Sequence, residues 1–266
     1  MNLFSRILNA FTEALFPTRC LICKRFYSIN HEHQQISKVI EHLNLSEPLT
    51  MMYRKQLFQD LMRPFLCETC LSDETPFRFD RFDQHEKEYN RFLSSVKALV
   101  RFDGTIRKLI HCLKYNRKIQ IAKPLGLWLF FLWIEQLREE RPSDLIIPVP
   151  LHRKRMRQRG FNQSYLLIRH WEKYKTQLPQ EYSNWHVRKD ILERTKYTLQ
   201  QVGLLKKERM ENVKNAFKVT KPEAVYGKSV LLIDDVFTTG ATSMACAQAL
   251  LLSGAICVDV MVLARI

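Results

Sequence analysis

The residues best suited to ligand chemistry lie in segment 230–242, where an apolar run ends in two adjacent carboxylates and small, hydroxyl-bearing residues follow. The apolar run is typical of a buried parallel strand, and Gly240 predicts a tight turn into a helix N-terminus. Backbone amides that converge at such a terminus bind phosphate. The ionised carboxylates of Asp234 and Asp235 only accept hydrogen bonds, which suits the vicinal hydroxyls of a ribose. The segment therefore predicts a site for a ribose 5-phosphate.

This order of strand, acidic pair, loop and helix resembles the fingerprint of type I phosphoribosyltransferases, which bind phosphoribosyl pyrophosphate (PRPP) with magnesium. The resemblance implies Mg²⁺ with PRPP as the ligand, and catalytic roles for Asp234 and Asp235 if the chain is an enzyme. The expected PRPP-binding residues are Asp234, Asp235, Thr238, Thr239, Gly240, Ala241 and Thr242. The alternative is an ordinary strand-turn-helix with a solvated acidic pair and a threonine cap.

A second segment with chemical potential follows an expected strand at 145–150. This loop, residues 151–162, carries five basic residues, which are Arg153, Lys154, Arg155, Arg157 and Arg159. Fixed cations at this place would stabilise the pyrophosphate that leaves PRPP. They would equally suit the phosphate backbone of DNA or RNA, or form an ordinary solvated basic surface. The sequence leaves these three interpretations open.

Two C-x-x-C pairs, Cys20 with Cys23 and Cys67 with Cys70, predict a metal site. Each pair can present two thiolates to one tetrahedral ion, so together they predict a closed, structural Zn²⁺ site. A disulfide or redox pair and four unligated thiols are the alternatives. The remaining cysteines lie among apolar neighbours and are expected to be small buried residues: Cys112, Cys246 and Cys257.

Residues 24–66, between the two cysteine pairs, are long and polar and predict an insertion into a zinc module, with a helix at about 47–62. The zinc site closes the base of this insertion, and closure entropy grows only slowly with loop length. Its histidines, His31, His33 and His42, are expected at the surface. We therefore divide the chain into a zinc-binding module, residues 1–90, and a phosphoribosyltransferase-like domain, residues 91–266.

From about residue 94 onward, segments of strand and helix length alternate. Strands are expected at 95–102, 145–150, 216–219, 229–236 and 255–263, and helices at 105–115, 122–138, 162–174, 198–212 and 242–252. This alternation predicts an α/β fold in which helices flank a parallel sheet. Ligands bind such sheets at the carboxyl ends of the strands. We therefore expect the acidic pair and the basic loop at the same edge.

The composition limits the partners of the chain. A formal net charge of +15 attracts polyanions, but it does not choose among nucleic acid, an anionic membrane and a phosphorylated substrate. The most apolar run, residues 125–134, is too short to cross a bilayer. Residues 1–16 predict an amphipathic packing helix, with peripheral contact to the inner membrane as the alternative. Without a signal peptide or transmembrane segment, a cytoplasmic protein is expected.

Two further features bear on the mechanism. Residues 185–201 lie where type I phosphoribosyltransferases carry a mobile loop that excludes water, so they are a candidate lid, and an ordinary basic connector is the alternative. The candidate lid cations are Arg188, Lys189, Arg194 and Lys196. The candidates for stacking on nucleobases are Trp171, Tyr174 and Trp185.

Several short motifs follow one another along the chain. They are LFPTRCLIC at 15–23, the cysteine pair at 67–70, FDGTIR at 102–107 with LKY at 113–115, PVPLH at 148–152 with RGFNQ at 159–163, the spaced Arg194, Thr198, Gln201, Arg209, Asn212 and Phe217, and the Asp-Asp loop. In this order they resemble the ComF/GntX-type family of competence-associated proteins, with a zinc finger and a type I phosphoribosyltransferase-like domain. The long spacing between the cysteine pairs departs from the usual pattern.

The resemblance implies a competence protein that handles incoming single-stranded DNA during natural transformation, with a helicase-like competence protein as partner. Two alternatives remain. One is an active phosphoribosyltransferase that uses PRPP and Mg²⁺ on an unidentified base. The other is a PRPP-sensing regulator that binds DNA, although no helix-turn-helix pattern is evident. The DNA-handling function is favoured because the sequence reveals no second pocket for an acceptor base.

Overall fold

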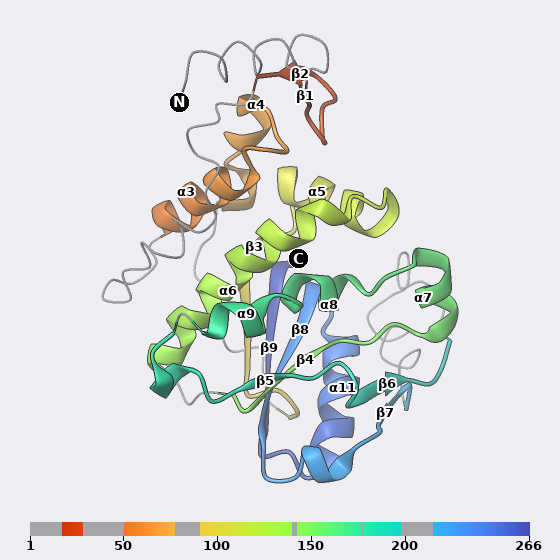
Figure 1. Ribbon diagram of the computed structural model, residues 1–266. Coiled ribbons are helices and arrows are strands. Elements are labelled where there is room, and N and C mark those ends of the chain that lie inside the picture. Colours follow the sequence, from red (N-terminus) through yellow and green to blue (C-terminus); the bar gives the residue numbers. More distant parts are fainter. Residues whose placement is uncertain (1–17, 29–50, 78–90, 140–142, 177, 198–214) are drawn as a thin grey trace.

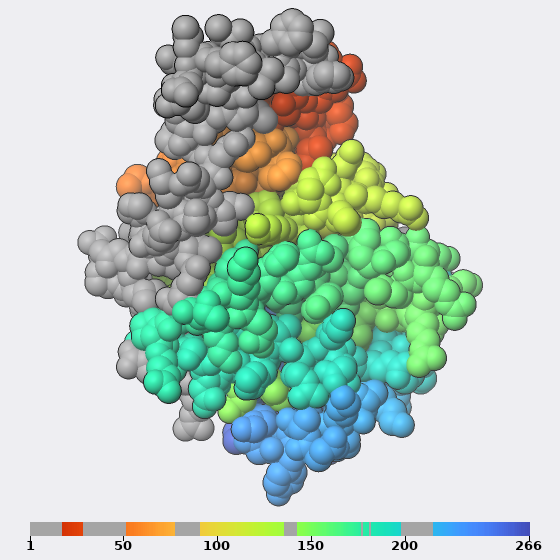
Figure 2. Space-filling model, in the orientation of Figure 1, coloured from red at the N-terminus to blue at the C-terminus, as the bar shows by residue number. Residues whose placement is uncertain are grey.

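The computed structural model describes residues 18–28, 51–77, 91–139, 143–176, 178–197 and 215–266. Within these residues the helices are α3 (Met51–Met62), α4 (Glu68–Leu71), α5 (Gly104–Tyr115), α6 (Ala122–Glu139), α7 (Arg153–Arg159), α8 (Gln163–Ile168), α9 (Trp171–Lys175) and α11 (Ala241–Leu252). Helix α5 lies between the cysteine-bearing segments, at the top of Figure 1, and a sheet with its flanking helices, below. In the space-filling view of Figure 2 its yellow-green surface likewise separates the red and orange segments from the green ones.

A five-stranded parallel sheet forms the centre of the fold, with the strand order β3-β9-β8-β4-β5. Its strands are β3 (Ser95–Arg101), β4 (Leu145–Pro148), β5 (His186–Val187), β8 (Ser229–Phe237) and β9 (Cys257–Arg265). Two antiparallel ribbons accompany it, β1 (Thr18–Arg19) with β2 (Phe26–Tyr27), and β6 (Leu192–Arg194) with β7 (Phe217–Val219). The predicted α/β fold with a parallel sheet flanked by helices is confirmed.

The side chains of β8 alternate between two hydrophobic layers. Leu231 and Ile233 pack into the layer that contains α5, α6 and α8. Val230 and Leu232 pack into the opposite layer, against α11. Successive residues of a strand point to opposite faces, and both faces of this strand are covered, which explains why its sequence is almost continuously apolar.

The helix expected over residues 162–174 is divided in the structure, so this expectation is wrong in part. α8 ends at Ile168, and α9 begins at Trp171. The break lets Trp171 pack against the side chain of Phe130 on α6, with 5.3 Å between the ring centroids. The break between α8 and α9 therefore allows the aromatic side chain of Trp171 to be buried in the core.

Gly126 brings α6 and α8 into backbone contact. A Cβ atom at this position would lie 1.8 Å from the carbonyl oxygen of Leu167, so only glycine fits. The carbonyl oxygen of Gly126 also accepts a 3.0 Å hydrogen bond from the indole nitrogen of the buried Trp171. These contacts fix α8 against the core, and α8 begins at the edge of the sheet where the acidic pair lies.

Helix α3, which lies in the predicted insertion, packs on α6. The rings of Phe58 and Trp128 are 4.9 Å apart, and the indole nitrogen of Trp128 donates a 3.0 Å hydrogen bond to the carbonyl oxygen of Arg54. The guanidinium of Arg54 also forms a 2.9 Å ion pair with Glu135. Residues on both sides of the boundary between residues 90 and 91 therefore contribute to one hydrophobic cluster.

The expected lid at 185–201 is wrong over its described part. β5 belongs to the central sheet, and Trp185, just before it, is fully buried. Arg188 forms a 2.9 Å ion pair with Asp190, and Arg194 is only 7% exposed on β6. The described part of the segment therefore belongs to the sheet and to the β6–β7 ribbon instead of forming a separate loop, although Arg194 does line the cleft described below.

Some expectations concern residues outside the described part of the chain. They are the helix at 1–16, the surface histidines at 31, 33 and 42, and the helix at 198–212. Among the residues that the structure describes, no helix combines the length and the apolar character needed to span a membrane.

Candidate functional site

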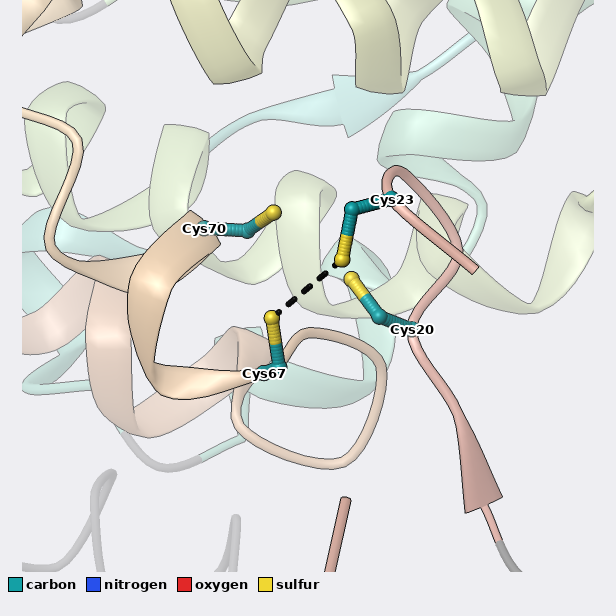
Figure 3. A group of neighbouring side chains, drawn as sticks. All are labelled: Cys20, Cys23, Cys67 and Cys70. Atoms are coloured by element: carbon teal, nitrogen blue, oxygen red, sulfur yellow. Dashed lines mark hydrogen bonds between the residues drawn. The ribbon is translucent and has the colours of Figure 1, made fainter. Parts of the chain in front are cut away.

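The four cysteines of the two C-x-x-C pairs converge at one point (Figure 3). Their sulfur atoms lie within 4.8 Å of one another, and the Sγ atoms of Cys23 and Cys67 are 3.5 Å apart. Sulfur ligands placed about 2.3 Å from a tetrahedral zinc ion are about 3.8 Å apart, so the cluster fits such an ion. Cys20 and Cys23 come from the turn after β1, and Cys67 and Cys70 from the start of α4.

Local backbone structure prepares this cluster for a metal. The carbonyl oxygen of Cys20 accepts the N–H of Lys24 at 3.1 Å, and Lys24 has the left-handed φ of 64° that this tight turn requires. The backbone N–H of Arg25 lowers the pKa of the Cys23 thiol to about 6, which favours the thiolate. Burial, by contrast, raises the pKa of Cys67 and Cys70, so these two thiols need a bound cation to ionise. Four sulfur ligands would leave no open position for a substrate, so a metal here would be structural.

The cysteine cluster is tied to α5 by hydrogen bonds. The backbone N–H of Thr105 donates to Asp73 at 2.6 Å, and the hydroxyl of Thr105 donates to the carbonyl oxygen of Cys70 at 3.0 Å. Gly104 has a φ of +48°, and a Cβ atom there would lie 2.3 Å from the Asp73 carboxylate. The first turn of α5 is therefore fixed directly to the segment that carries Cys70.

A cleft of about 1310 Å³ lies at the carboxyl ends of the central strands. Its walls come from α5, from the segments that follow β4 and β8, from α7, and from the starts of α8 and α11. This is the edge at which parallel sheets bind their ligands. The acidic pair and part of the basic segment line the same cleft.

Asp234 and Asp235, at the end of β8, both line the cleft. Asp235 is 2% exposed, and its Oδ2 atom forms a 2.5 Å ion pair with the Nζ atom of Lys114 on α5. Burial, together with the neighbouring Asp235 carboxylate, raises the pKa of Asp234 to about 7. One carboxylate is thus neutralised by a cation, and the other titrates near neutral pH.

Three consecutive residues at the start of α8 organise the cleft. The side chain of Asn162 caps α8 and donates a 3.0 Å hydrogen bond to the backbone just after β4. Gln163 accepts a 2.5 Å hydrogen bond from the guanidinium of Arg159. The hydroxyl of Ser164 donates to the Oδ1 atom of Asp234 at 2.8 Å. The order of these residues connects the sheet, the basic segment and the acidic pair.

The loop after the acidic pair turns at Gly240, which has a φ of 73° and directly precedes α11. The first amides of a helix have no acceptor within the helix, so they are available to an anion. Thr238, Gly240, Ala241 and Thr242 line the cleft, whereas Thr239 is not among its lining residues. The structure therefore brings together four of the five loop residues that we predicted for the ligand.

The basic segment after β4 contains a helix, so the expectation of a loop throughout 151–162 is wrong. The Nδ1 atom of His152 accepts the N–H of Lys154 at 3.1 Å and caps the N-terminus of α7. Gly160, with a φ of 86°, ends the helix. The sequence concealed this element because its residues are polar, and no apolar stripe marks a helix that buries none of its residues.

The helical twist separates the five basic residues of α7. Arg155 and Arg159 lie one turn apart and line the cleft. Arg153 forms a 3.0 Å ion pair with Glu193, the ammonium of Lys154 lies over the ring of Tyr197, and Arg157 is exposed. Only two of the five predicted contacts therefore line the cleft, and the others extend the positive charge around its rim.

Several cleft residues were missed from the sequence. The turn that carries Cys20 and Cys23 contributes Leu21, Ile22 and Lys24 to the wall, so the cysteine cluster borders the cleft. Lys114 on α5 and Gln163 on α8 also line the cleft. Arg194 on β6, which the sequence indicated as a candidate lid cation, lines it as well. Most of these positions fall inside the motifs that carry the family resemblance, and those motifs were the sequence signal that could have identified them.

The aromatic residues proposed for base stacking are core residues, so that expectation is wrong. Trp171, Tyr174 and Trp185 are at most 6% exposed, and their rings surround Phe130 at centroid distances of 5.3 to 6.4 Å. The layer against α6 needs large apolar groups, and these residues supply them. By contrast, Tyr115 at the cleft is 51% exposed.

The chain was compared with known proteins. No protein-family model matches it. The chain is 39% identical over 165 residues to the DNA utilization protein YhgH of Escherichia coli O6:H1, and 38% identical over 165 residues to the same-named protein of strain K12. Each match covers 59% of this chain and 66% of the relative. Competence protein F of Haemophilus influenzae is 36% identical over 141 residues, which is 50% of this chain and 56% of that protein.

The matched part of the chain thus spans just under two thirds of the first two relatives and just over half of the third. The fold, an α/β protein with a parallel sheet and a four-cysteine cluster, agrees with the family that the sequence motifs suggested. The chain belongs to the ComF-type family.

Proposed function

We propose that this protein handles single-stranded DNA during DNA uptake in natural transformation, and that its cleft binds a ribose 5-phosphate such as PRPP. The names of the relatives, competence protein F and DNA utilization protein, support the first part. The observation that carries the second part is that the acidic pair of β8 and the N-terminus of α11 line one cleft. In this proposal the protein acts in the cytoplasm, at the inner membrane, beside a helicase-like competence partner.

The ribose-phosphate part rests on the charges of the cleft. The loop at 238–242 offers amides and hydroxyls to a phosphate, and the acidic pair offers acceptors to a diol. Arg155 and Arg159 line the same cleft and would supply the cations that a pyrophosphate needs. Asp234 and Asp235 would hold the ribose and, through its oxygens, Mg²⁺, which prefers carboxylate and phosphate ligands. Zn²⁺ at the cysteine cluster would maintain the adjoining wall.

The DNA part rests on exposed positive charge around the cleft. Arg107, Lys108 and Arg117 are exposed on or just after α5, and Arg157 is exposed on α7. Arg25 is exposed beside the cysteine cluster. Such a surface attracts a phosphate backbone without reading its sequence. In this proposal the zinc-bearing segment and the cleft rim bind the strand together.

The salt dependence of binding tests the DNA part. The affinity of the zinc-loaded protein for a labelled oligothymidylate should fall by about 0.7 log unit per log unit of salt for each neutralised phosphate. Reversing Arg155, Arg157 and Arg159 to Glu together should abolish binding, and Arg157→Glu alone should reduce both affinity and slope. Lys228→Glu, a matched reversal of an exposed lysine before β8, should change neither. Binding that does not respond to salt would contradict the proposal.

A second candidate function is an active phosphoribosyltransferase. The observation that favours it is the size of the cleft, which continues from the acidic pair to α5 and the turn beside Cys23 and so leaves space for an acceptor. The test is release of pyrophosphate from PRPP and Mg²⁺ in the presence of individual nucleobases, with Asp235→Asn as the inactive variant and Cys257→Ser as the matched control. If no base supports release while PRPP still binds, the cleft is a binding site only.

A further inference from the structure

Two exposed rings stand on the face of α5 that borders the cleft. His111 and Tyr115 are one helical turn apart, and their ring centroids are separated by 4.7 Å with 42° between the ring planes. Both residues line the cleft, and Tyr115 is 51% exposed. An aromatic pair of this kind, exposed to water and beside a polar site, offers ring surface on which a planar group can stack.

The ring of Tyr115 is held beside the charged part of the cleft. The guanidinium of Arg159 lies 5.5 Å from its centroid, and Gln163 fixes that guanidinium through a 2.5 Å hydrogen bond. The residue before Tyr115 is Lys114, which is paired with Asp235. The aromatic pair and the acidic pair therefore line the same cleft, and Lys114 connects α5 to the acidic pair.

The turn that carries Cys20 and Cys23 lies beside α5 and lines the same cleft. Leu21 and Ile22 are apolar and half-buried, and Lys24, which also lines the cleft, places its ammonium 2.6 Å from the carbonyl oxygen of Leu21. A flat group lying on the aromatic pair would thus sit in a cleft that both apolar side chains and cations line. Planar heterocycles with polar edges fit these surroundings.

We propose that His111 and Tyr115 form a stacking subsite for a nucleobase, next to the ribose-phosphate part of the cleft. The inference rests on the proposed function, because the neighbouring acidic pair is taken as a ribose site. The base is supplied either by single-stranded DNA crossing the cleft or by a free nucleobase beside a bound ribose phosphate. The chemistry of recognition is the same, and the experiment separates the two sources.

Because aromatic residues four positions apart also stabilise a helix, the test needs a readout that this structural role would not move. Removing a stacking ring lowers affinity without changing the number of phosphates neutralised. Tyr115→Ala should therefore weaken binding of the zinc-loaded protein to a labelled oligothymidylate about tenfold, at an unchanged salt slope. Tyr115→Phe, which keeps the ring, should stay within about twofold. His111→Ala should give a smaller loss.

Tyr226→Ala is the matched control, because Tyr226 is 77% exposed and precedes β8, at the edge of the sheet opposite the cleft. It should leave oligonucleotide affinity unchanged. Thermal unfolding and zinc content of every variant show whether the fold is intact. If Tyr115→Ala reduces the zinc content or the unfolding midpoint, Tyr115→Phe and Tyr115→Trp are compared instead, because both keep a ring. The Tyr115→Trp variant should then bind the oligonucleotide more tightly than Tyr115→Phe.

The second arm measures binding of free adenine and free thymine by calorimetry, with and without ribose 5-phosphate. If the base belongs to a strand, only the oligonucleotide responds to Tyr115→Ala. If the bound base is a free nucleobase, Tyr115→Ala weakens the binding of adenine or thymine, and ribose 5-phosphate strengthens that binding in the wild-type protein. If neither responds while the wild-type protein binds DNA with a steep salt slope, the subsite is wrong and the proposed function survives. If the wild-type protein binds neither probe, the proposed function fails with it.

Discussion

The cysteine cluster and the carboxylate cleft are neighbours that differ in how completely their polar groups satisfy one another. Four sulfur atoms within 4.8 Å of one another match the full coordination of one ion. In the cleft, Lys114 meets Asp235 and Ser164 meets Asp234, yet about 1310 Å³ of space remains beside them. The first arrangement is closed, and the second leaves an open cleft beside its charged groups.

The comparison shows that a closed site can shape an open one. The turn between Cys20 and Cys23 serves both, because it carries two sulfur ligands and also presents Leu21 and Ile22 to the cleft. Thr105 adds a second connection through its hydrogen bond to the carbonyl oxygen of Cys70. A structural metal would therefore affect ligand binding through position alone, without taking part in any reaction.

The largest expected effect comes from opening the closed site. Cys67→Ser should cause loss of zinc and lower the free energy of unfolding by an amount approaching the roughly 10 kcal/mol of a structural zinc site. Cys257→Ser, a half-buried cysteine outside the cluster, is the matched control and should keep its metal. Metal analysis and chemical unfolding check both variants. Equal stability of Cys67→Ser and Cys257→Ser would contradict the distinction drawn above.

The next effect concerns the ion pair in the cleft. Asp235→Asn leaves the ammonium of Lys114 without its carboxylate and should destabilise the protein by about 3 kcal/mol, as for other buried pairs. Adding Lys114→Met should recover most of this stability. Binding of ribose 5-phosphate, measured by calorimetry, should be lost in both variants. If the double variant binds ribose 5-phosphate normally, Asp235 has a structural role only.

A pH-dependent effect follows from the raised pKa of Asp234. The folded protein keeps a proton on Asp234 up to about pH 7, whereas the unfolded chain releases it near pH 3.8, so this group makes stability fall as pH rises between these values. Asp234→Asn keeps an acceptor oxygen for Ser164 and cannot ionise. Its stability relative to the wild type should therefore increase from pH 4 to about pH 7 and then level off. Thermal unfolding across this range measures it, and a constant difference would show that Asp234 has an ordinary pKa.

The smallest effect concerns one hydrogen bond. Ser164→Ala removes the 2.8 Å contact to Asp234 and should cost about 1 kcal/mol of stability. Without this donor the carboxylate loses stabilisation of its charged form, so the pKa of Asp234 should rise further. Ser183→Ala, which removes a 2.8 Å hydrogen bond in an exposed turn, is the matched control. An unchanged pH profile in Ser164→Ala would show that this contact does not tune the cleft.

Much of the fold could be predicted because strong local patterns produced it. The apolar run at 229–236 and the helical spacing at 105–115 became β8 and α5 with boundaries shifted by one residue at most. The cysteine pairs were equally readable, because their C-x-x-C spacing predicts one shared site, and the structure brings the four sulfur atoms together. Helix α7 was missed because a short, polar helix ordered by its caps carries no periodic signal.

The cleft was harder to predict because its residues come from separate segments. Lys114 and Asp235 are more than 100 positions apart in the sequence, and nothing local at either position announces the other. The choice of Trp171 and Trp185 as exposed stacking residues failed for a related reason. Burial depends on what packs opposite a side chain, and composition does not contain that information.

The absence of a side chain at Gly126 has a consequence for residues far from it. Because α8 contacts α6 through backbone atoms, the contact between Gly126 and the carbonyl group of Leu167 helps to fix the position of α8 relative to the acidic pair. A single methyl group added at Gly126 would push the carbonyl group of Leu167, and α8 with it, away from α6. Gln163 and Ser164 would then move relative to Arg159 and Asp234, to which they are hydrogen-bonded. A Gly126→Ala substitution, at a position outside the cleft lining, would thereby disturb the hydrogen bonds of Gln163 to Arg159 and of Ser164 to Asp234.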